Sequence, residues 1–262
     1  MTDAVATIEN KQSHQTTDVG GAFMLAFGSL GYLSFLAAFL YAIGFVGNWL
    51  VPKSIDSGPT ESTALSLLIN AALLSIFAIQ HTIMARPAFK RWWTSVIPKC
   101  AERSIFVLLA SASLGLTFWQ WRPLPHELWH VTGPVATVLS ALSLAGWAIV
   151  FIASFTINHF DLFGLRQAWF RFQNQPYVPV GFRLAGFYRV VRHPLMAGFI
   201  IAFWATPVMS VGHLFFAAMT TAYIRFGTWV EERDLIAEHG ERYLDYARRV
   251  RGLIPLPKNP PA

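Results

Sequence analysis

Long apolar stretches constrain this 262-residue chain more than any other feature of its sequence. A helix needs about 20 apolar residues to cross a bilayer. A stretch at 194–230 is too long for one span, and Pro207 and Gly212 near its middle predict two short helices that form a hairpin. The other stretches are predicted as single spans: 23–46, 64–84, 104–121 and 135–155. The predicted fold class is all-α, a polytopic integral membrane helical bundle of about four spans plus a C-terminal helical hairpin.

The charged residues support this prediction. They make up 13% of the chain, whereas soluble domains carry about 25%. Basic residues follow spans two and four and the hairpin, and the opposite loops carry only Lys53 and Arg122. This positive-inside pattern predicts that both termini and the long loops lie in the cytoplasm. The net charge of +6 is therefore attributed to topology and to attraction for anionic membrane lipid, and no nucleic-acid partner is expected.

Three parts are expected along the chain. Residues 1–20 form a flexible cytoplasmic tail, because they lack the basic start and apolar core of a signal peptide. The transmembrane helices of 21–157 and the loop, hairpin and C-terminal segment of 158–262 are expected to form one integrated domain. Cys100 is the only cysteine, which excludes an internal disulfide and a thiolate metal cluster. No obligate protein partner is evident.

The densest polar motif, residues 188–198, lies at the start of the hairpin and reads Tyr-Arg-Val-Val-Arg-His-Pro-Leu-Met-Ala-Gly. Pro194 suits the first turn of a helix, and the free N–H groups of such a turn can bind a carboxylate. Gly198 allows another backbone or a ligand to approach closely. The alternative interpretation is that Arg192 and His193 anchor a helix at the lipid headgroups.

A second motif contains Glu231 and Glu232, where the hairpin's second helix leaves the membrane. Acidic residues at that depth are costly unless they are paired, which predicts partners among basic residues nearby: Arg189, Arg192 and Arg225. A carboxylate here could bind ribose hydroxyls or stabilise a sulfonium. A purely structural network of ion pairs is the alternative.

Further candidates lie at the ends of two spans. His81 follows Gln80 near the end of span two, and its unperturbed pKa near neutrality suits a general base. An alternative role for His81 is a hydrogen bond to a neighbouring helix. The run 158–167, just past span four, contains His159, Asp161 and Arg166. Its structural alternative is a capped turn in which Asp161 is the cap.

Two features of the sequence argue against other chemistries. Residues 126–130 read His-Glu-Leu-Trp-His, which matches the zinc-protease pattern, but they lie in a short loop flanked by prolines. That chemistry needs both histidines on one rigid helix and a third ligand, so the match is interpreted as a coincidence and no metal is expected. The chain also has no glycine-rich dinucleotide fingerprint and no Walker loop.

The C-terminal motifs resemble those of the isoprenylcysteine carboxyl methyltransferase-like membrane enzymes. The residues that carry this resemblance are Arg192-His193-Pro194, Gly198, Glu231-Glu232-Arg233-Asp234-Leu235, Gly240, Tyr243, Tyr246, Val250 and Pro255. Other features are similar to a bacterial branch, the methanethiol S-methyltransferases, with the NnrU-type proteins as neighbours. These features are Gln80-His81, Met84-Ala85-Arg86, Ala101-Glu102-Arg103-Ser104 and residues 158–166. The similarity extends from about the first span to Pro255.

The resemblance implies a bacterial inner-membrane enzyme that binds S-adenosyl-L-methionine in its cytoplasmic C-terminal loops. Where many members have an aromatic residue two positions after the proline, this chain has Met196, which can pack against the cofactor instead. The residues expected to bind the cofactor are Tyr188, Arg192, His193, Pro194, Leu195, Met196, Gly198, Glu231 and Glu232.

The implied reaction transfers a methyl group to a small thiol, methanethiol, and gives dimethyl sulfide. A thiolate is the reactive nucleophile, so a base or a cation must assist. His81 and His159 are the candidate bases, Arg103 and Arg166 the candidate cations, and Asp161 belongs to the same catalytic group. Two alternatives stay open: a larger lipophilic thiol or prenylcysteine carboxylate as acceptor, and, in another class, a haem- or quinone-linked membrane protein.

Overall fold

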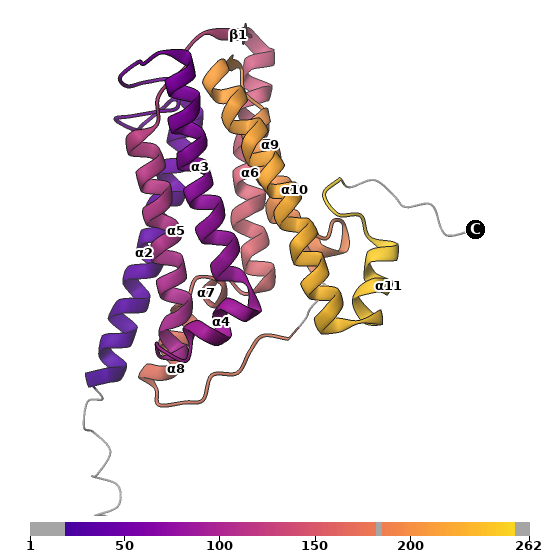
Figure 1. Ribbon diagram of the computed structural model, residues 1–262. Helices are drawn as coiled ribbons and strands as arrows, with labels where there is room; N and C mark the ends of the chain where they lie inside the picture. The colour runs from indigo at the N-terminus through magenta and orange to yellow at the C-terminus, as the bar shows by residue number, and fades with distance from the viewer. Residues whose placement is uncertain (1–18, 182–184, 255–262) are drawn as a thin grey trace, which may run out of the picture.

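The computed structural model describes residues 19–181 and 185–254. Figure 1 shows α2, α3, α5, α6, α9 and α10 side by side as a bundle, with β1 at one end and α4, α7 and α8 at the other. The elements in chain order are α2 (Val19–Gly47), α3 (Thr63–Ala85), α4 (Pro87–Trp93), α5 (Lys99–Gln120), β1 (Glu127–His130), α6 (Gly133–Ile157), α7 (His159–Leu162), α8 (Leu165–Phe172), the 3-10 turn η1 (Gly186–Arg189), α9 (Pro194–Trp204), β2 (Val208–Ser210), α10 (Val211–His239) and α11 (Glu241–Arg249).

Four described helices are long and apolar enough to cross a membrane, namely α2, α3, α5 and α6. The predicted spans are therefore confirmed, with ends that differ by a few residues. The predicted tail lies outside the described residues up to position 18, and its last two residues already belong to α2. The stretch predicted as a hairpin divides into α9 and α10, which pack against each other and are joined through β2.

Small residues lie inside the bundle and large apolar residues lie outside. A Cβ atom added at Gly28 of α2 would lie 2.5 Å from the Cβ of Ala168, and one added at Gly31 would lie 3.3 Å from the carbonyl oxygen of Ser104. Large exposed side chains include Leu33 of α2 and Leu68 of α3, which are 60% and 68% exposed. Lipid solvates such side chains well, so helices associate through small residues that allow close packing.

The most extensive helix contact joins α6 and α9, and their backbones approach each other closely. A Cβ atom at Gly146 would lie 2.6 Å from the carbonyl oxygen of Gly198, and one at Gly198 would lie 2.7 Å from the carbonyl oxygen of Gly146. Ser143 Oγ reinforces the contact by donating a hydrogen bond of 2.9 Å to the carbonyl oxygen of Ala202. Since α9 is only 11 residues long, this contact with α6 fixes its position in the bundle.

At one end of the bundle, β1 pairs antiparallel with β2. The His-Glu-Leu-Trp-His motif thus lies mostly in a strand, with exposed side chains, and His130 Nδ1 lies 3.1 Å from Glu127 Oε2. A strand turns successive side chains to opposite faces, so the helical geometry of a zinc protease is not present here. A core of large side chains lies beneath this end, including Phe45, Trp121 and Trp147.

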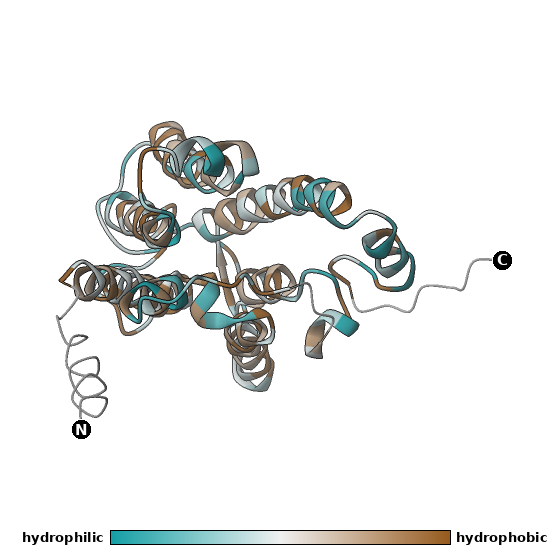
Figure 2. Cartoon of the chain, turned by 90° about the horizontal axis from the view of Figure 1, so that it is seen from below, coloured by the Kyte–Doolittle hydropathy of each residue, from teal (hydrophilic) through white to brown (hydrophobic). Residues whose placement is uncertain are grey.

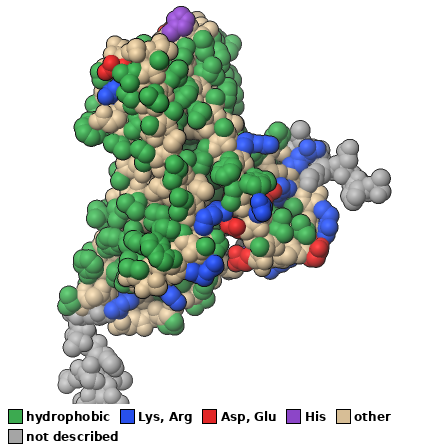
Figure 3. All heavy atoms as spheres, in the orientation of Figure 1, with side chains coloured by type: hydrophobic (Ala, Val, Ile, Leu, Met, Phe, Trp, Pro, Cys, Tyr) green, Lys and Arg blue, Asp and Glu red, His purple; other side chains and the backbone are tan. Residues whose placement is uncertain are grey.

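The other end, called the basic end below, carries α4, α7, α8 and α11. Figure 3 shows apolar side chains over most of the bundle, with most charged side chains gathered toward this end and on the lobe formed by α11. Seen from the basic end in Figure 2, α10 leads outward to α11, whose residues are largely hydrophilic. An ion pair of 2.8 Å between Arg86 Nη1 and Asp234 Oδ2 ties the end of α3 to α10.

The contact between α6 and α9 is tested by adding one methyl group. Gly146→Ala places a Cβ atom 2.6 Å from two backbone atoms of α9, so we expect a loss of about 1–3 kcal/mol in the free energy of unfolding. Gly115→Ala on α5 is the matched control, because its Cβ meets nothing within 4 Å and alanine favours helix. Thermal unfolding in detergent measures both, and equal midpoints would contradict the packing role.

Candidate active site

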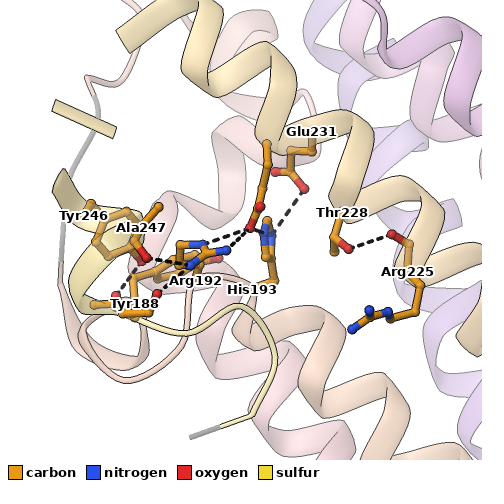
Figure 4. Close-up of polar contacts among 10 residues, drawn as sticks. Tyr188, Arg192, His193, Arg225, Thr228, Glu231, Tyr246 and Ala247 are labelled. Carbon is orange, nitrogen blue, oxygen red and sulfur yellow. Dashed lines mark hydrogen bonds and ion pairs between the residues drawn. The ribbon is translucent and has the colours of Figure 1, made fainter. Parts of the chain in front are cut away.

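A cluster of charges joins the start of α9 to α10 (Figure 4). Glu232 Oε1 accepts hydrogen bonds from Nε and Nη2 of Arg192, at 2.9 and 2.6 Å, and from Nε2 of His193, at 2.9 Å. Nδ1 of His193 faces Oε2 of Glu231 at 3.5 Å. The side chains of Arg192 and His193 are only 13% and 6% exposed. Two basic side chains therefore meet two carboxylates, and only the carboxylate of Glu231 is half exposed to water.

The last turn of α11 and the chain that follows it complete the environment of Arg192. Its Nη1 donates to the carbonyl oxygens of Ala247 and Val250, at 3.2 and 2.6 Å. Its backbone N–H donates to the carbonyl oxygen of Arg251 at 2.8 Å, and the next N–H donates to that of Gly252 at 3.0 Å. The planar guanidinium thus bridges a carboxylate and two carbonyls, a geometry that a lysine cannot reproduce.

The start of α9 offers free backbone donors. Pro194 occupies its first turn, as predicted, and no side chain caps the helix. Ala197 N donates back to the carbonyl oxygen of His193, whereas the N–H groups of Leu195 and Met196 make no hydrogen bond within the described ranges. Such free donors at the start of a helix favour an anionic group.

Two further residues of the 188–198 motif have backbone contacts. The carbonyl oxygen of Tyr188, in η1, accepts a 2.6 Å hydrogen bond from the hydroxyl of Tyr246, and burial raises the pKa of Tyr188. Gly198 faces Gly146 of α6. The close approach that the sequence predicted at Gly198 is therefore made by another backbone.

The glutamates stabilise the charged form of His193. Burial alone would lower the pKa of its imidazole, but the hydrogen bonds and charges of Glu231 and Glu232 outweigh burial and raise that pKa to about 9. The hydrogen bond from His193, together with Arg192, lowers the pKa of Glu232 to about 2. At neutral pH the cluster therefore contains an imidazolium, which is a poor proton acceptor.

His81 lies in α3 between aromatic rings. Its imidazole centroid is 5.2 Å from the ring of Phe77 and 4.8 Å from the ring of Phe106. Its Nδ1 is buried without a hydrogen-bond partner among the described residues, and so is Oε1 of neighbouring Gln80. Buried polar atoms of a native protein are normally paired, so orphans of this kind point to a missing partner.

The charged groups that act on His81 are Arg103 of α5 and Glu231 of α10. Arg103 lies over the ring of Phe106, with Cζ 4.8 Å from the ring centroid, and its Nε donates to the carbonyl oxygen of Leu162 at 2.7 Å. The predicted base and one predicted cation therefore share an aromatic neighbour, and a glutamate of the charge cluster lies within electrostatic reach of the base.

His159, the other predicted base, has both ring nitrogens occupied. Ser154 Oγ donates to the carbonyl oxygen of Phe151, so it must accept from Nδ1 of His159, at 2.6 Å. Nε2 is then the acceptor for the hydroxyl of Tyr32, at 2.9 Å. The ring also stacks on Phe155 with centroids 4.1 Å apart, and burial lowers its pKa. The ring is a neutral connector between α2, α6 and α7.

Asp161 and Arg166 pair with each other at 3.0 Å, and Asp161 Oδ1 also accepts from the hydroxyl of Tyr177 at 2.8 Å. The capped turn of the structural alternative is present, but its cap is Asn158, whose Oδ1 accepts from the backbone N–H of Asp161. Arg166 also donates to the carbonyl oxygen of Val178, so this pair fixes the chain that follows α8.

Of the three arginines predicted to pair with Glu231 and Glu232, only Arg192 does so. Neither Arg189 nor Arg225 contacts Glu231 or Glu232 within the described part of the chain, and Figure 4 shows the side chain of Arg225 apart from the cluster. No sequence signal pointed to the carbonyl groups of 247–252 that hold Arg192, because a backbone acceptor has no residue signature. The pairing of Asp234 with Arg86 was also missed.

Comparison with known proteins identifies the family. Residues 68–230 match the model of the NnrU protein family, and no solved structure matches the chain significantly. A protein named methanethiol S-methyltransferase 2 from Bradyrhizobium diazoefficiens is 51% identical over 88% of this chain and 90% of its own length. Proteins named methanethiol S-methyltransferase from Crocosphaera subtropica and Mycobacterium tuberculosis are 46% and 49% identical, over 95% and 89% of this chain and 98% and 96% of their own lengths.

The chain is a helical membrane protein of the NnrU family. Within that family it belongs with the proteins named methanethiol S-methyltransferase.

The charge cluster predicts a pH-dependent stability. The pKa of His193 is raised from 6.5 to about 9, so its contribution is fully present below pH 6.5 and is lost as the pH rises through 9. A shift of this size corresponds to about 3 kcal/mol. His193→Gln has no imidazole to lose its proton, so we expect the variant's free energy of unfolding to depend less on pH between 6 and 9.5 than that of the unchanged protein. His126→Gln, at the opposite exposed end, is the control, and parallel curves for all three proteins would refute the assignment.

Proposed function

We propose that this chain transfers a methyl group from S-adenosyl-L-methionine to methanethiol and releases dimethyl sulfide. Its relatives' shared name gives the acceptor and the type of transfer. The observation that carries the residue assignment is the unpartnered Nδ1 of His81, buried between aromatic rings where both Arg103 and Glu231 act on it. These residues come from α3, α5 and α10, so the reaction would occur where the three helices meet.

The residues at the start of α9 fit such a cofactor. The free N–H groups of Leu195 and Met196 suit its carboxylate. The side chain of Glu231 is half exposed, so it has room to bind ribose hydroxyls or to offset the sulfonium charge. Arg192, His193 and Glu232, tied to each other, would hold this turn and Glu231 in position. Tyr188 and the half-buried Met196 offer apolar surface to the remaining part of the cofactor.

His81 is proposed as the general base. When bound, the cofactor supplies an electrophilic methyl group on a positively charged sulfur. His81 Nδ1 would take the proton of the thiol, and the resulting thiolate could then accept that methyl group in exchange for the cofactor's sulfur. Arg103 would stabilise the thiolate in the meantime. Phe77 and Phe106 exclude water from the base, which favours alignment of the reacting sulfurs in a dry site.

The other predicted catalytic residues are proposed to act through position. His159 holds α7 against α2 and α6, and Asp161 with Arg166 holds the loop beyond α8. Arg103 lies beside α7, where its Nε donates a hydrogen bond to the carbonyl oxygen of Leu162. We also propose that the basic end faces the cytoplasm, because it carries most of the Lys and Arg residues, and that the membrane is the bacterial inner membrane. An apolar acceptor and product can then pass through the lipid.

Headspace gas chromatography tests the reaction. Purified protein supplied with S-adenosyl-L-methionine and methanethiol is expected to form dimethyl sulfide, and samples without cofactor are not. Parallel samples with a longer alkyl thiol or a prenylcysteine test the larger acceptors. Protein that binds the cofactor in calorimetry and methylates only a larger acceptor would overturn the assignment to methanethiol. Protein that neither binds nor methylates would overturn the proposed function.

His81→Ala tests the base. We expect its turnover to fall by about 10²–10⁴-fold, with cofactor binding unchanged in calorimetry. The loss of turnover should shrink as the pH rises toward the pKa of the thiol, because the acceptor then ionises without help. His126→Ala, on the exposed β1 end, is the matched control and should keep full turnover. A His81→Ala variant with a pH-independent loss would show that His81 has a different role.

A further inference from the structure

A cavity of about 740 Å³ opens at the basic end, between α4, the start of α5, α7, α8 and the chain after α8. The residues that line it include more cations than anions. The cations are Lys90, Lys99, Arg103 and Arg171, and the anions are Glu102 and Asp161. The carboxylate of Asp161 is already engaged by Arg166 and Tyr177. The cavity therefore has a surplus of positive charge.

Several cationic atoms among these side chains lack a partner. The side-chain ammonium groups of Lys90 and Lys99 make no hydrogen bond or ion pair within 19–181 and 185–254, and the Nη atoms of Arg103 make no hydrogen bond there. Burial and then the charge of Arg103 lower the pKa of Lys90, and Glu102 offsets this only in part. Two cations are thus held close to each other in a half-buried place, and an anion between them would relieve their repulsion.

The start of α5 adds to this preference for an anion. The helix follows Pro98, whose side chain provides no cap, and its first two residues, Lys99 and Cys100, both line the cavity. The first N–H groups of a 22-residue helix and its dipole favour negative charge there. Lys99 and the start of α5 therefore border the same cavity as Lys90.

The surroundings place the cavity at the level of lipid headgroups. Trp92 of α4 and Trp169 of α8 are 58% and 45% exposed on the elements that border it. Tryptophan is enriched at the boundary between membrane and water. The ends of α5 and α6, two of the apolar spans, meet the same cavity through Lys99 and Ile157.

We propose that this cavity binds a phosphate group, carried by an anionic lipid headgroup or by a soluble phosphate, through Lys90, Lys99 and the start of α5. The charge cluster of Arg192, His193 and Glu232 contributes no residue to this cavity. The phosphate site is therefore separate from the residues proposed to bind the cofactor, although Arg103 borders both the cavity and His81. An occupied cavity would fix α4 and α8 against α5.

Thermal unfolding of the full-length protein in detergent tests the proposal. The probes are dioctanoyl phosphatidylglycerol, the neutral-headgroup lipid dioctanoyl phosphatidylcholine, and inorganic phosphate at constant ionic strength. We expect the anionic lipid to raise the unfolding midpoint more than phosphatidylcholine does. Lys90→Gln and Lys99→Gln should each require about tenfold more phosphatidylglycerol for the same rise in unfolding midpoint. Arg91→Gln removes an exposed charge from the same helix and should behave as the unchanged protein.

The outcomes separate the possible occupants. A shift with inorganic phosphate alone, lost in Lys90→Gln and Lys99→Gln, supports the site and assigns it to a soluble phosphate. Equal shifts in Lys90→Gln, Lys99→Gln and Arg91→Gln would overturn it, and so would the absence of any shift. Calorimetry with S-adenosyl-L-methionine is run on the same variants. Loss of cofactor binding without any phosphate effect would also overturn the proposal, because the cavity would then belong to the cofactor.

Discussion

The backbone contact between α6 and α9 is the constraint on which the rest of this structure depends. Gly146 and Gly198 let the two helices approach so closely that neither position has room for a Cβ atom. Because α9 has only 11 residues, its start cannot be placed by length alone, as the start of a full span can. The glycine contact therefore decides where Pro194 and the free N–H groups of the first turn lie.

Charge pairing then connects that turn to α10 and to the end of the chain. Glu232 accepts from both Arg192 and His193, and Nη1 of Arg192 reaches carbonyl groups in the last turn of α11 and just after it. Removing one partner from such a buried set leaves another charge uncompensated, which typically costs about 3–5 kcal/mol. The cluster thus joins three segments that are distant in the sequence, and it leaves Glu231 with the most exposed carboxylate of the set.

The histidines of the basic end have different roles because their hydrogen bonds differ. His193 lies between two carboxylates and is positively charged at neutral pH. His159 donates from one nitrogen and accepts at the other, so its lone pair is used within the protein. His81 has a buried nitrogen without a partner, beside aromatic rings and within reach of Arg103. Three similar residues near span ends therefore differ in the availability of a proton acceptor.

The sequence by itself determined the membrane class, the four spans and the concentration of polar motifs at one end, because bilayer thickness and apolar content leave few alternatives. It also predicted the helix that starts at Pro194 and the pairing of Arg192 with the glutamates. Only the tertiary structure decided which histidine nitrogen lacks a hydrogen-bond partner, which is Nδ1 of His81. It also decided that Asn158, and not Asp161, caps the turn, and that Gly198 faces the backbone of α6. It also placed residues 247–252 beside Arg192. Such contacts depend on the relative depth and rotation of helices, and apolar periodicity in a lipid environment leaves both undetermined.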